Sequence, residues 1–270
     1  MKDLKIIEKS ITKKFKKEIW LKFIKAIKDF DLIKEDDKIA VCISGGKDSL
    51  LLAKCFQELK KHQQINFELL FLLMDPGYDK SSLNLIKDNL KKLNIPIKIF
   101  NTKIFEIIEK RKDKSACYLC SKMRRGYLYN EAKKLGCNKI ALAHHLNDVT
   151  TTILMSILYN GQFKTILPKL KSTNFKNMEL IRPFYYIDED DIIKWQKYNN
   201  LTFLKSNCPY FNKDNKREKM NNLIKDLIKE NKEVNLNIFH STENVNLKTL
   251  ISYKIKDKII HFLHDDEEKI

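Results

Sequence analysis

Ser44-Gly45-Gly46-Lys47-Asp48-Ser49 is the stretch of this 270-residue sequence that decides its fold. The stretch follows an apolar segment that ends at Ile43, and a helical pattern begins near Leu50. Adjacent glycines let a backbone turn tightly and approach an anion, and the free N–H groups at a helix start point toward it. A strand, a tight loop and a helix in this order therefore predict a phosphate-binding site.

The polar side chains of the stretch suit a nucleotide. The hydroxyls of Ser44 and Ser49 can donate hydrogen bonds to phosphate oxygens. Lys47 can neutralise phosphate charge, and Asp48 can hold Mg²⁺. The G-x-x-x-x-G-K-[ST] spacing of a Walker loop is absent. An ordinary connection that happens to contain two glycines is the alternative, but six ordered positions in this context favour an ATP site.

Strand-like and helix-like segments alternate after the loop. The predicted strands cover residues 38–43, 67–74, 95–100 and 139–143, and the predicted helices cover 49–61, 81–93, 121–135 and a segment ending at 158. This alternation predicts an α/β fold, a doubly wound parallel sheet with helices on both faces. We also expect one basic amphipathic helix over residues 1–30 and a mainly helical C-terminal part, with helices near 188–198 and 215–230.

The charge and hydropathy restrict the class of protein. A net charge of +17, from 52 basic and 35 acidic residues, is enough to hold a polyanion such as tRNA. Nearly all basic residues are lysines, so a compositional bias is the alternative explanation. The longest apolar run, Leu69 to Met74, is too short for a membrane span, and the start of the chain lacks a signal-peptide pattern. We expect a cytoplasmic protein without a membrane partner.

Arginine is rare and confined to the part of the chain that carries the unusual cysteines. The five arginines are Arg111, Arg124, Arg125, Arg182 and Arg217. Where lysine is the default cation, a guanidinium indicates planar, bidentate binding of phosphate or carboxylate. Chance clustering is the alternative. We predict that tRNA binds across the face that carries Arg124, Arg125 and Arg182.

Cys117 and Cys120 form a C-x-x-C pair that we expect just before a helix, where the helix dipole favours thiolates. A redox pair, a structural zinc site and an iron–sulfur site are the three interpretations. The zinc site lacks a second C-x-x-C, whereas the iron–sulfur site would add Cys208 and leave one iron open. The other cysteines, Cys42, Cys55 and Cys137, are expected in the core.

A second polar segment, Ala143-His144-His145-Leu146-Asn147-Asp148, lies where a strand ends and a helix begins. Together with the glycine loop and the Cys117 to Gly126 segment, in this order, it closely resembles the TtcA-type tRNA 2-thiolation enzymes of the PP-loop ATPase superfamily. The resemblance runs from about Ile39 to Asp226 and includes Leu180-Ile181-Arg182-Pro183.

This resemblance implies a transferase that uses ATP to adenylate the C2 carbonyl of a tRNA pyrimidine, an anticodon-loop cytidine, with release of pyrophosphate. Sulfur then replaces the oxygen, and AMP leaves. A [4Fe–4S] cluster held by the cysteines matching Cys117, Cys120 and Cys208 would carry the sulfur. A cysteine desulfurase or another sulfur donor would be the partner, and a homodimer is left open.

The resemblance also assigns roles to individual residues. Asp148 would hold Mg²⁺ or position the adenylate, and Arg124 and Arg125 would hold phosphate or the developing oxyanion. Met74, at the end of the second strand, and His144 would contact the nucleotide. The predicted domains are a basic helix over residues 1–35, a PP-loop ATPase and thiolation domain over 36–230, and an extension over 231–270 without an assigned role.

Two features depart from the family pattern. The family sequence G-H-H-x-D-D reads Ala-His-His-Leu-Asn-Asp here, so Asn147 replaces an acidic residue. Cys208 lacks the second cysteine that often follows it. Two other functions remain as alternatives: a PP-loop ligase that joins an amine to an adenylated substrate, and a non-catalytic iron–sulfur sensor that binds nucleic acid. The ligase leaves the cysteines unexplained, and the sensor leaves the loop from Ser44 to Ser49 unexplained.

Overall fold

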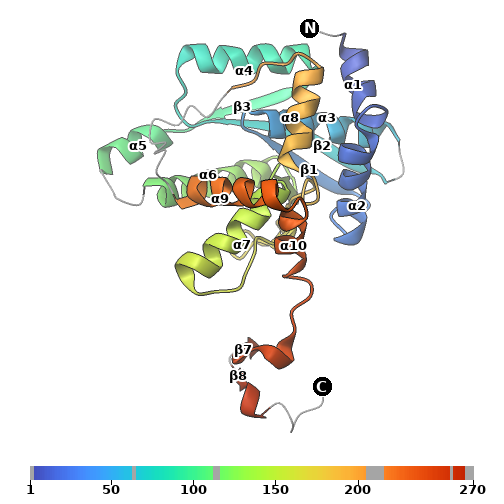
Figure 1. The fold of residues 1–270 in the computed structure, drawn as a ribbon. Coiled ribbons are helices and arrows are strands. Elements are labelled where there is room, and N and C mark those ends of the chain that lie inside the picture. The colour runs from blue at the N-terminus through green and yellow to red at the C-terminus, as the bar shows by residue number, and fades with distance from the viewer. Residues whose placement is uncertain (1–2, 63–64, 112–115, 205–215, 256–257, 265–270) are drawn as a thin grey trace.

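A six-stranded sheet forms the centre of the protein (Figure 1). The computed structural model describes residues 3–62, 65–111, 116–204, 216–255 and 258–264. The sheet order is β3-β2-β1-β4-β6-β5, and all neighbouring strands are parallel except β5 and β6. Its strands are β1 (Asp37–Ile43), β2 (Phe67–Asp75), β3 (Ile97–Asn101), β4 (Lys139–Ala141), β5 (Lys169–Lys171) and β6 (Glu179–Ile181). The predicted parallel α/β sheet is confirmed.

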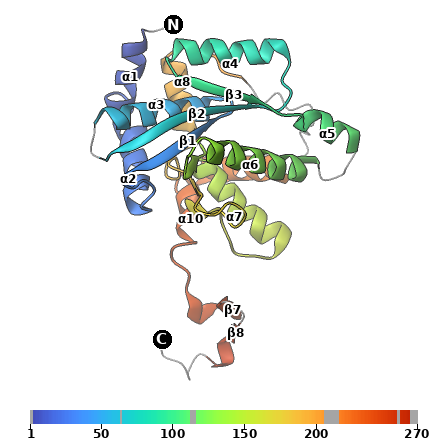
Figure 2. The same cartoon turned by 180° about the vertical axis from the view of Figure 1, so that it is seen from behind.

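Helices cover both faces of the sheet (Figure 2). The helices are α1 (Leu4–Thr12), α2 (Leu21–Asp29), α3 (Lys47–Lys61), α4 (Lys80–Lys92), α5 (Ile104–Arg111), α6 (Ala116–Lys134), α7 (Leu146–Asn160), α8 (Glu189–Tyr198), α9 (Lys216–Glu230) and α10 (Val234–His240). On one face, α1 to α4 and α8 share a core with the side chains of Ile39, Val41 and Ile43. On the other face, α6 packs against Ala40 and Cys42. The two sets alternate along β1, as a strand buried on both faces requires.

The N-terminal segment is not the single α-helix that the periodicity predicts. A π-helical turn, Lys16–Trp20, separates α1 from α2. The apolar residues of the N-terminal segment recur every four positions, whereas a regular α-helix has about 3.6 residues per turn. In a regular helix each apolar side chain would therefore be rotated about the helix axis by about 40° relative to the previous one. A π-helical turn contains more residues than an α-helical turn and so offsets this rotation, which keeps the apolar side chains on one face. The N–H of Phe15 donates to the carbonyl of Ser10 at 2.8 Å, a five-residue step, and the side chains of Phe15, Ile19 and Phe23 are all buried.

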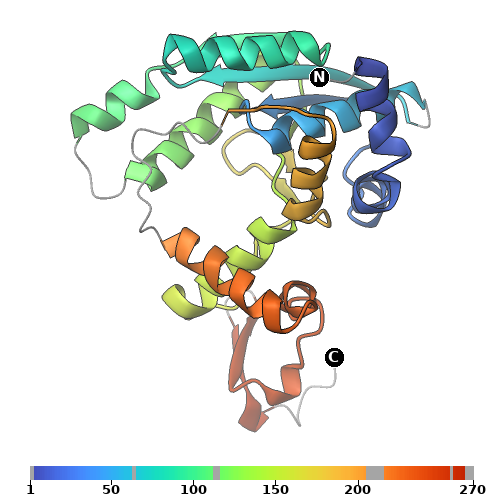
Figure 3. The same ribbon diagram turned by 45° about the horizontal axis from the view of Figure 1, so that its top comes forward.

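The C-terminal part extends away from the sheet. Helices α9 and α7 lie side by side and pack together, and α10 contacts both (Figure 3). Beyond α10 the chain forms a β-hairpin of β7 (Ser252–Ile255) and β8 (Lys258–His261), flanked by 3₁₀ turns at Leu247–Thr249 and Phe262–His264. This hairpin was not predicted. None of the helices in the described parts of the chain is long and apolar enough to cross a membrane.

Candidate functional site

A cavity of about 1110 Å³ opens at the carboxyl ends of β1, β2 and β4. The chain leaves β1 toward β2 and β3 on one side, and it later returns to form β4 on the other side. Parallel α/β sheets bind ligands where the strand order reverses in this way. The cavity wall includes Ser44, Gly46, Lys47, Asp48, Ser49, Met74, Tyr78, Cys117, Cys120, Arg124, Arg125, His144, Arg182 and Leu204.

The conformation of the glycine loop is stabilised by hydrogen bonds within the loop. The Ser49 hydroxyl accepts from the N–H of Ser44 at 3.1 Å and donates to the carbonyl of Gly46 at 3.1 Å. Gly46 precedes α3 and provides no side-chain cap, and Gly46, Lys47 and Asp48 line the cavity, so the start of this helix can bind an anion. Gly45 has a φ of 85°, and a Cβ there would lie 2.5 Å from Cγ1 of Ile86. Glycine is therefore required at this position by both backbone and packing.

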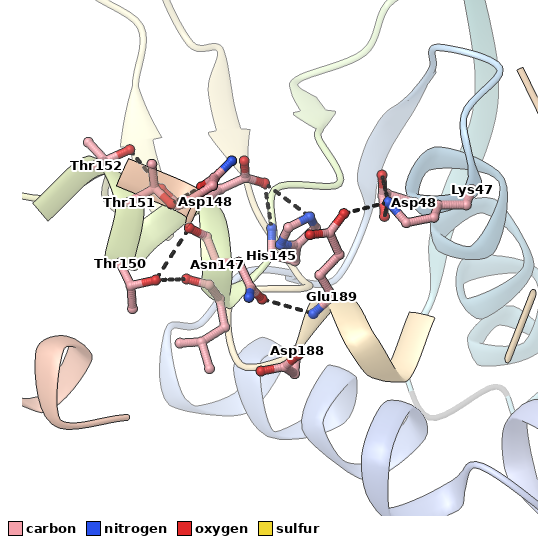
Figure 4. A network of polar contacts seen from close by, with 12 residues as sticks. Lys47, Asp48, His145, Asn147, Asp148, Thr150, Thr151, Thr152, Asp188 and Glu189 are labelled. Atoms are coloured by element: carbon pink, nitrogen blue, oxygen red, sulfur yellow. Dashed lines mark hydrogen bonds and ion pairs between the residues drawn. The ribbon is translucent and has the colours of Figure 1, made fainter. Parts of the chain in front are cut away.

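Lys47 is shared between two carboxylates (Figure 4). Its Nζ lies 2.8 Å from Oε1 of Glu189 and 3.2 Å from Oδ1 of Asp48. Burial opposes the charge of the Lys47 ammonium, but Asp48 and Glu189 outweigh it and raise its pKa. Burial likewise opposes ionisation of Glu189, and its bond from Lys47 lowers the Glu189 pKa overall. Both partners are therefore charged at neutral pH.

The His144 to Asp148 segment joins β4 to α7. Burial lowers the pKa of His144 to about 4 despite the nearby Asp148, so the imidazole that faces the cavity is neutral at pH 7. Burial would raise the pKa of Asp148, but His145, His144 and Arg217 lower it to about 2. Asp148 accepts from the N–H of His145 at 3.1 Å and pairs with Nη2 of Arg217 at 2.5 Å.

His144 and Asp148 differ in their position relative to the cavity. Asp148 is not among the residues that line the described cavity, whereas His144 and Met74 are. Asn147 replaces the family's acidic residue, and its Oδ1 accepts from the backbone N–H of Glu189 at 2.8 Å. A carboxylate oxygen at this position could accept the same bond.

The cysteine pair faces the same cavity as the glycine loop. Cys117 and Cys120 lie in the first turns of α6, not before the helix as the sequence suggested, because α6 begins at Ala116. Cys208 lies outside the described residues, and Leu204, four positions before it, lines the cavity. Across the residues that the structure describes, no group of three or more His, Cys, Asp or Glu side chains is arranged to hold a metal ion. The buried positions of Cys42, Cys55 and Cys137 are confirmed.

The arginines occupy three different environments. Arg124 lies on the cavity wall with its guanidinium 5.7 Å from the ring centre of Phe105, and exposed Arg125 lines the same wall. Arg182 was predicted on a tRNA-binding face, but it is only 7% exposed and donates to the carbonyl of Leu167. Burial lowers the pKa of Arg182 to about 10. This part of the prediction is wrong, because Arg182 belongs to the inner wall of the cavity.

Sequence reasoning missed Glu189 and the Arg217 contact. Glu189 lies 142 residues after Lys47, so their contact depends on how the fold brings α8 to the loop. Arg217 was identified as a rare arginine, and its partner Asp148 lies 69 residues earlier. The run of acidic residues at the start of α8 was the available signal, but it is also what a helix N-terminus favours for its dipole.

Comparison with known proteins gives consistent matches. Residues 12–230 match the family model of the PP-loop domain. The tRNA-cytidine(32) 2-sulfurtransferase of Coxiella burnetii (strain Dugway 5J108-111) is 35% identical over 236 residues, covering 86% of this chain and 91% of that protein. The protein of the same name from Syntrophotalea carbinolica (strain DSM 2380 / NBRC 103641 / GraBd1) is 33% identical over 255 residues, covering 93% and 96%.

A solved structure resembles most of the chain. The U34-tRNA thiolase NcsA from Methanococcus maripaludis, solved with its [4Fe–4S] cluster, superposes with a TM-score of 0.67. The two chains are 25% identical, and the match covers 83% of this chain and 77% of the thiolase.

Proposed function

The chain belongs to the PP-loop family and, within it, to the tRNA-cytidine(32) 2-sulfurtransferases, and from this premise we propose that it thiolates a tRNA cytidine at C2 at the expense of ATP. One observation carries the proposal: a single cavity is lined both by the glycine loop and by the Cys117 and Cys120 pair. An ATP-activated base and a sulfur source could meet there without crossing bulk solvent.

The loop would bind the nucleotide. The N–H groups that begin α3, with the Ser44 and Ser49 hydroxyls, can hold the pyrophosphate, and Lys47 can neutralise it. Asp48 would hold Mg²⁺, which would supply positive charge beside the phosphates. Met74, at the end of β2, would contact the adenine.

The cysteines fit an iron–sulfur cluster. Two thiols three positions apart on one helix face line the cavity, and the third, Cys208, follows a segment whose described end at Leu204 lines it too. When bound, a [4Fe–4S] cluster with three cysteine ligands supplies an open iron that can bind sulfide.

The base chemistry would take place between these two parts. The C2 oxygen of the cytidine bonds to the α-phosphorus of ATP, and pyrophosphate leaves. Hydrosulfide then bonds to C2 through its electron pair and loses its proton, and AMP leaves with the former oxygen. Arg124 and Arg125 would stabilise negative charge that develops on the phosphate and on the oxygen that leaves C2. Neutral His144 can donate or accept one hydrogen bond at the nucleotide, and Asp148, held by Arg217, would position this segment.

The proposal includes the other expected partners. A cysteine desulfurase or another donor would supply the sulfur, and the protein would act in the cytoplasm, as a homodimer if it associates. The predicted division into residues 1–35, 36–230 and 231–270 remains part of this proposal. The core of the α/β part includes Ile7 and Ile11 of α1, so the first segment is expected to fold together with the second.

The experiment is an assay of anaerobically purified protein with ATP, sulfide and unmodified tRNA. We expect a brown protein that forms AMP and pyrophosphate only when tRNA is present. An iron–sulfur sensor would be brown without forming AMP. A ligase would form AMP only with an added amine and would keep its activity after removal of the iron.

Arg124 and Arg125 provide a separate prediction about tRNA. Changing both to alanine is expected to weaken tRNA binding and to reduce the slope of log affinity against log salt by roughly one to two, because phosphate contacts release counterions. Arg111→Ala is the matched control, since Arg111 is exposed but absent from the cavity wall. If the double variant kept the affinity and the salt slope while AMP formation fell, the two arginines would act in the chemistry and not in tRNA binding.

A further inference from the structure

The ion pair between Lys47 and Glu189 connects the start of α3 with the start of α8. The proposed function assigns a role to Lys47 but none to Glu189. Lys47 begins α3 directly after the glycine loop, and Glu189 begins α8. Their side chains are 21% and 29% exposed, so water screens the pair only in part. Asp48 is the neighbour of Lys47 in α3, whereas Glu189 belongs to a different helix, α8.

The position of Glu189 is itself fixed by hydrogen bonds. Its backbone N–H donates to Oδ1 of Asn147 at 2.8 Å, and Asn147 belongs to the first turn of α7 (Figure 4). Asp188, which precedes α8, accepts from the N–H of Asp190 at 2.8 Å and so caps the helix start. The Glu189 carboxylate that pairs with Lys47 therefore belongs to a helix start that is held by two hydrogen bonds, one to Asn147 and one to Asp188.

We propose that Glu189 is a positioning residue of the nucleotide site, which holds the Lys47 ammonium at the cavity wall until a triphosphate takes it over. The proposal rests on the function proposed above, because it requires ATP at the glycine loop. Lys47 lines the cavity, whereas Glu189 is absent from its wall, so a phosphate oxygen can reach the ammonium from the open side. A nucleotide must then compete with Glu189 for the same cation.

Because of this competition, removing the charge of Glu189 should strengthen ATP binding, whereas damage to the structure would weaken it. In Glu189→Gln the side chain keeps its shape but loses its charge, so ATP no longer has to displace a carboxylate. Ion pairs of this exposure contribute up to about 1 kcal/mol, and the dissociation constant for ATP is therefore expected to fall about fivefold. A variant that merely loosened the site would bind ATP more weakly.

The test measures ATP and pyrophosphate binding by titration calorimetry on the full chain. Asp190→Asn is the matched control: it removes the same charge one position later, from an exposed side chain. The second comparison repeats Glu189→Gln in a Lys47→Ala background. We expect the gain in affinity in Glu189→Gln alone, little change in Asp190→Asn, and no gain once Lys47 is removed.

Three results would overturn the proposal. One is unchanged or weaker ATP binding in Glu189→Gln. Another is an equal gain in Asp190→Asn, which would reflect general electrostatics. The third is a gain that persists without Lys47. Absence of ATP binding by the unaltered protein is a different outcome, because it would contradict the proposed function itself.

Asn147 offers an independent variant for the same inference. Asn147→Ala removes the acceptor for the Glu189 N–H, so the carboxylate should hold Lys47 less well and ATP should again bind more tightly, by less than in Glu189→Gln. Combining the two substitutions should give no further gain, because both act on one contact. Additive gains would show that Asn147 acts on ATP by another route.

Discussion

Asp48→Ala is expected to reduce tRNA-dependent AMP formation by at least about 100-fold, the usual cost of removing a group that stabilises charge in the transition state. Asp48 lies on the cavity wall within the first turn of α3, and it is the carboxylate closest in sequence to the loop glycines. It would hold Mg²⁺, which would neutralise charge on the phosphates. The measurement is the initial rate of AMP release at saturating ATP and tRNA.

The control for this prediction is Asp88→Ala, which removes a carboxylate from the exposed side of α4. Circular dichroism and the unfolding midpoint should be similar for both variants, since neither side chain belongs to the buried core. AMP formation in Asp48→Ala at the rate of the unaltered protein would remove Asp48 from the nucleotide site.

Cys208→Ser is expected to abolish thiolation and the visible absorbance of the cluster, while ATP affinity stays unchanged. Serine is a poor ligand for iron in place of a thiolate, and two cysteines, Cys117 and Cys120, would remain. The nucleotide is bound by the loop that follows β1, through groups other than these thiols. Iron content, absorbance and 2-thiocytidine formation are measured on the same anaerobic sample.

Cys137→Ala is the matched control for the loss of a thiol. Cys137 is buried against the α6 face of the sheet, and burial raises its pKa to about 11, so it is a core residue and not a metal ligand. This variant should keep its iron and its activity, with some loss of stability from the cavity created. Full iron content and activity in Cys208→Ser would contradict the three-cysteine site.

The parts of the fold that local patterns determine were predicted well. Strands β1 and β2 are apolar runs bounded by turn residues, and α3 follows two glycines, so their positions agree with the sequence to within a few residues. Strands β5 and β6 have only three residues each, too few to show a period, and neither continues into a longer apolar run, as the equally short β4 does through Ala143. The N-terminal helix was predicted without its π turn, which depends on packing against the sheet.

Within the site, the residues of the loop and the cysteine pair could be predicted because each motif lies within a few neighbouring positions of the sequence. The contact from Lys47 to Glu189 was not, since it joins segments 142 residues apart. The burial of Arg182 was not predictable either: the rarity of arginine indicated a special role, but only the fold decides whether a guanidinium faces solvent or a cavity. Sequence reasoning therefore identified the loop and the cysteine pair, which line the cavity, and missed the contact between Lys47 and Glu189.

Mass spectrometry of the nucleosides from tRNA treated with the purified protein, ATP and sulfide under anaerobic conditions measures the proposed thiolation directly. We expect 2-thiocytidine in the tRNA, formed in equal amount to AMP. It should be absent without ATP, and absent with Asp48→Ala or Cys208→Ser protein. AMP formation with no thiolated base in the tRNA, or thiolation that proceeds without ATP, would contradict the proposed function.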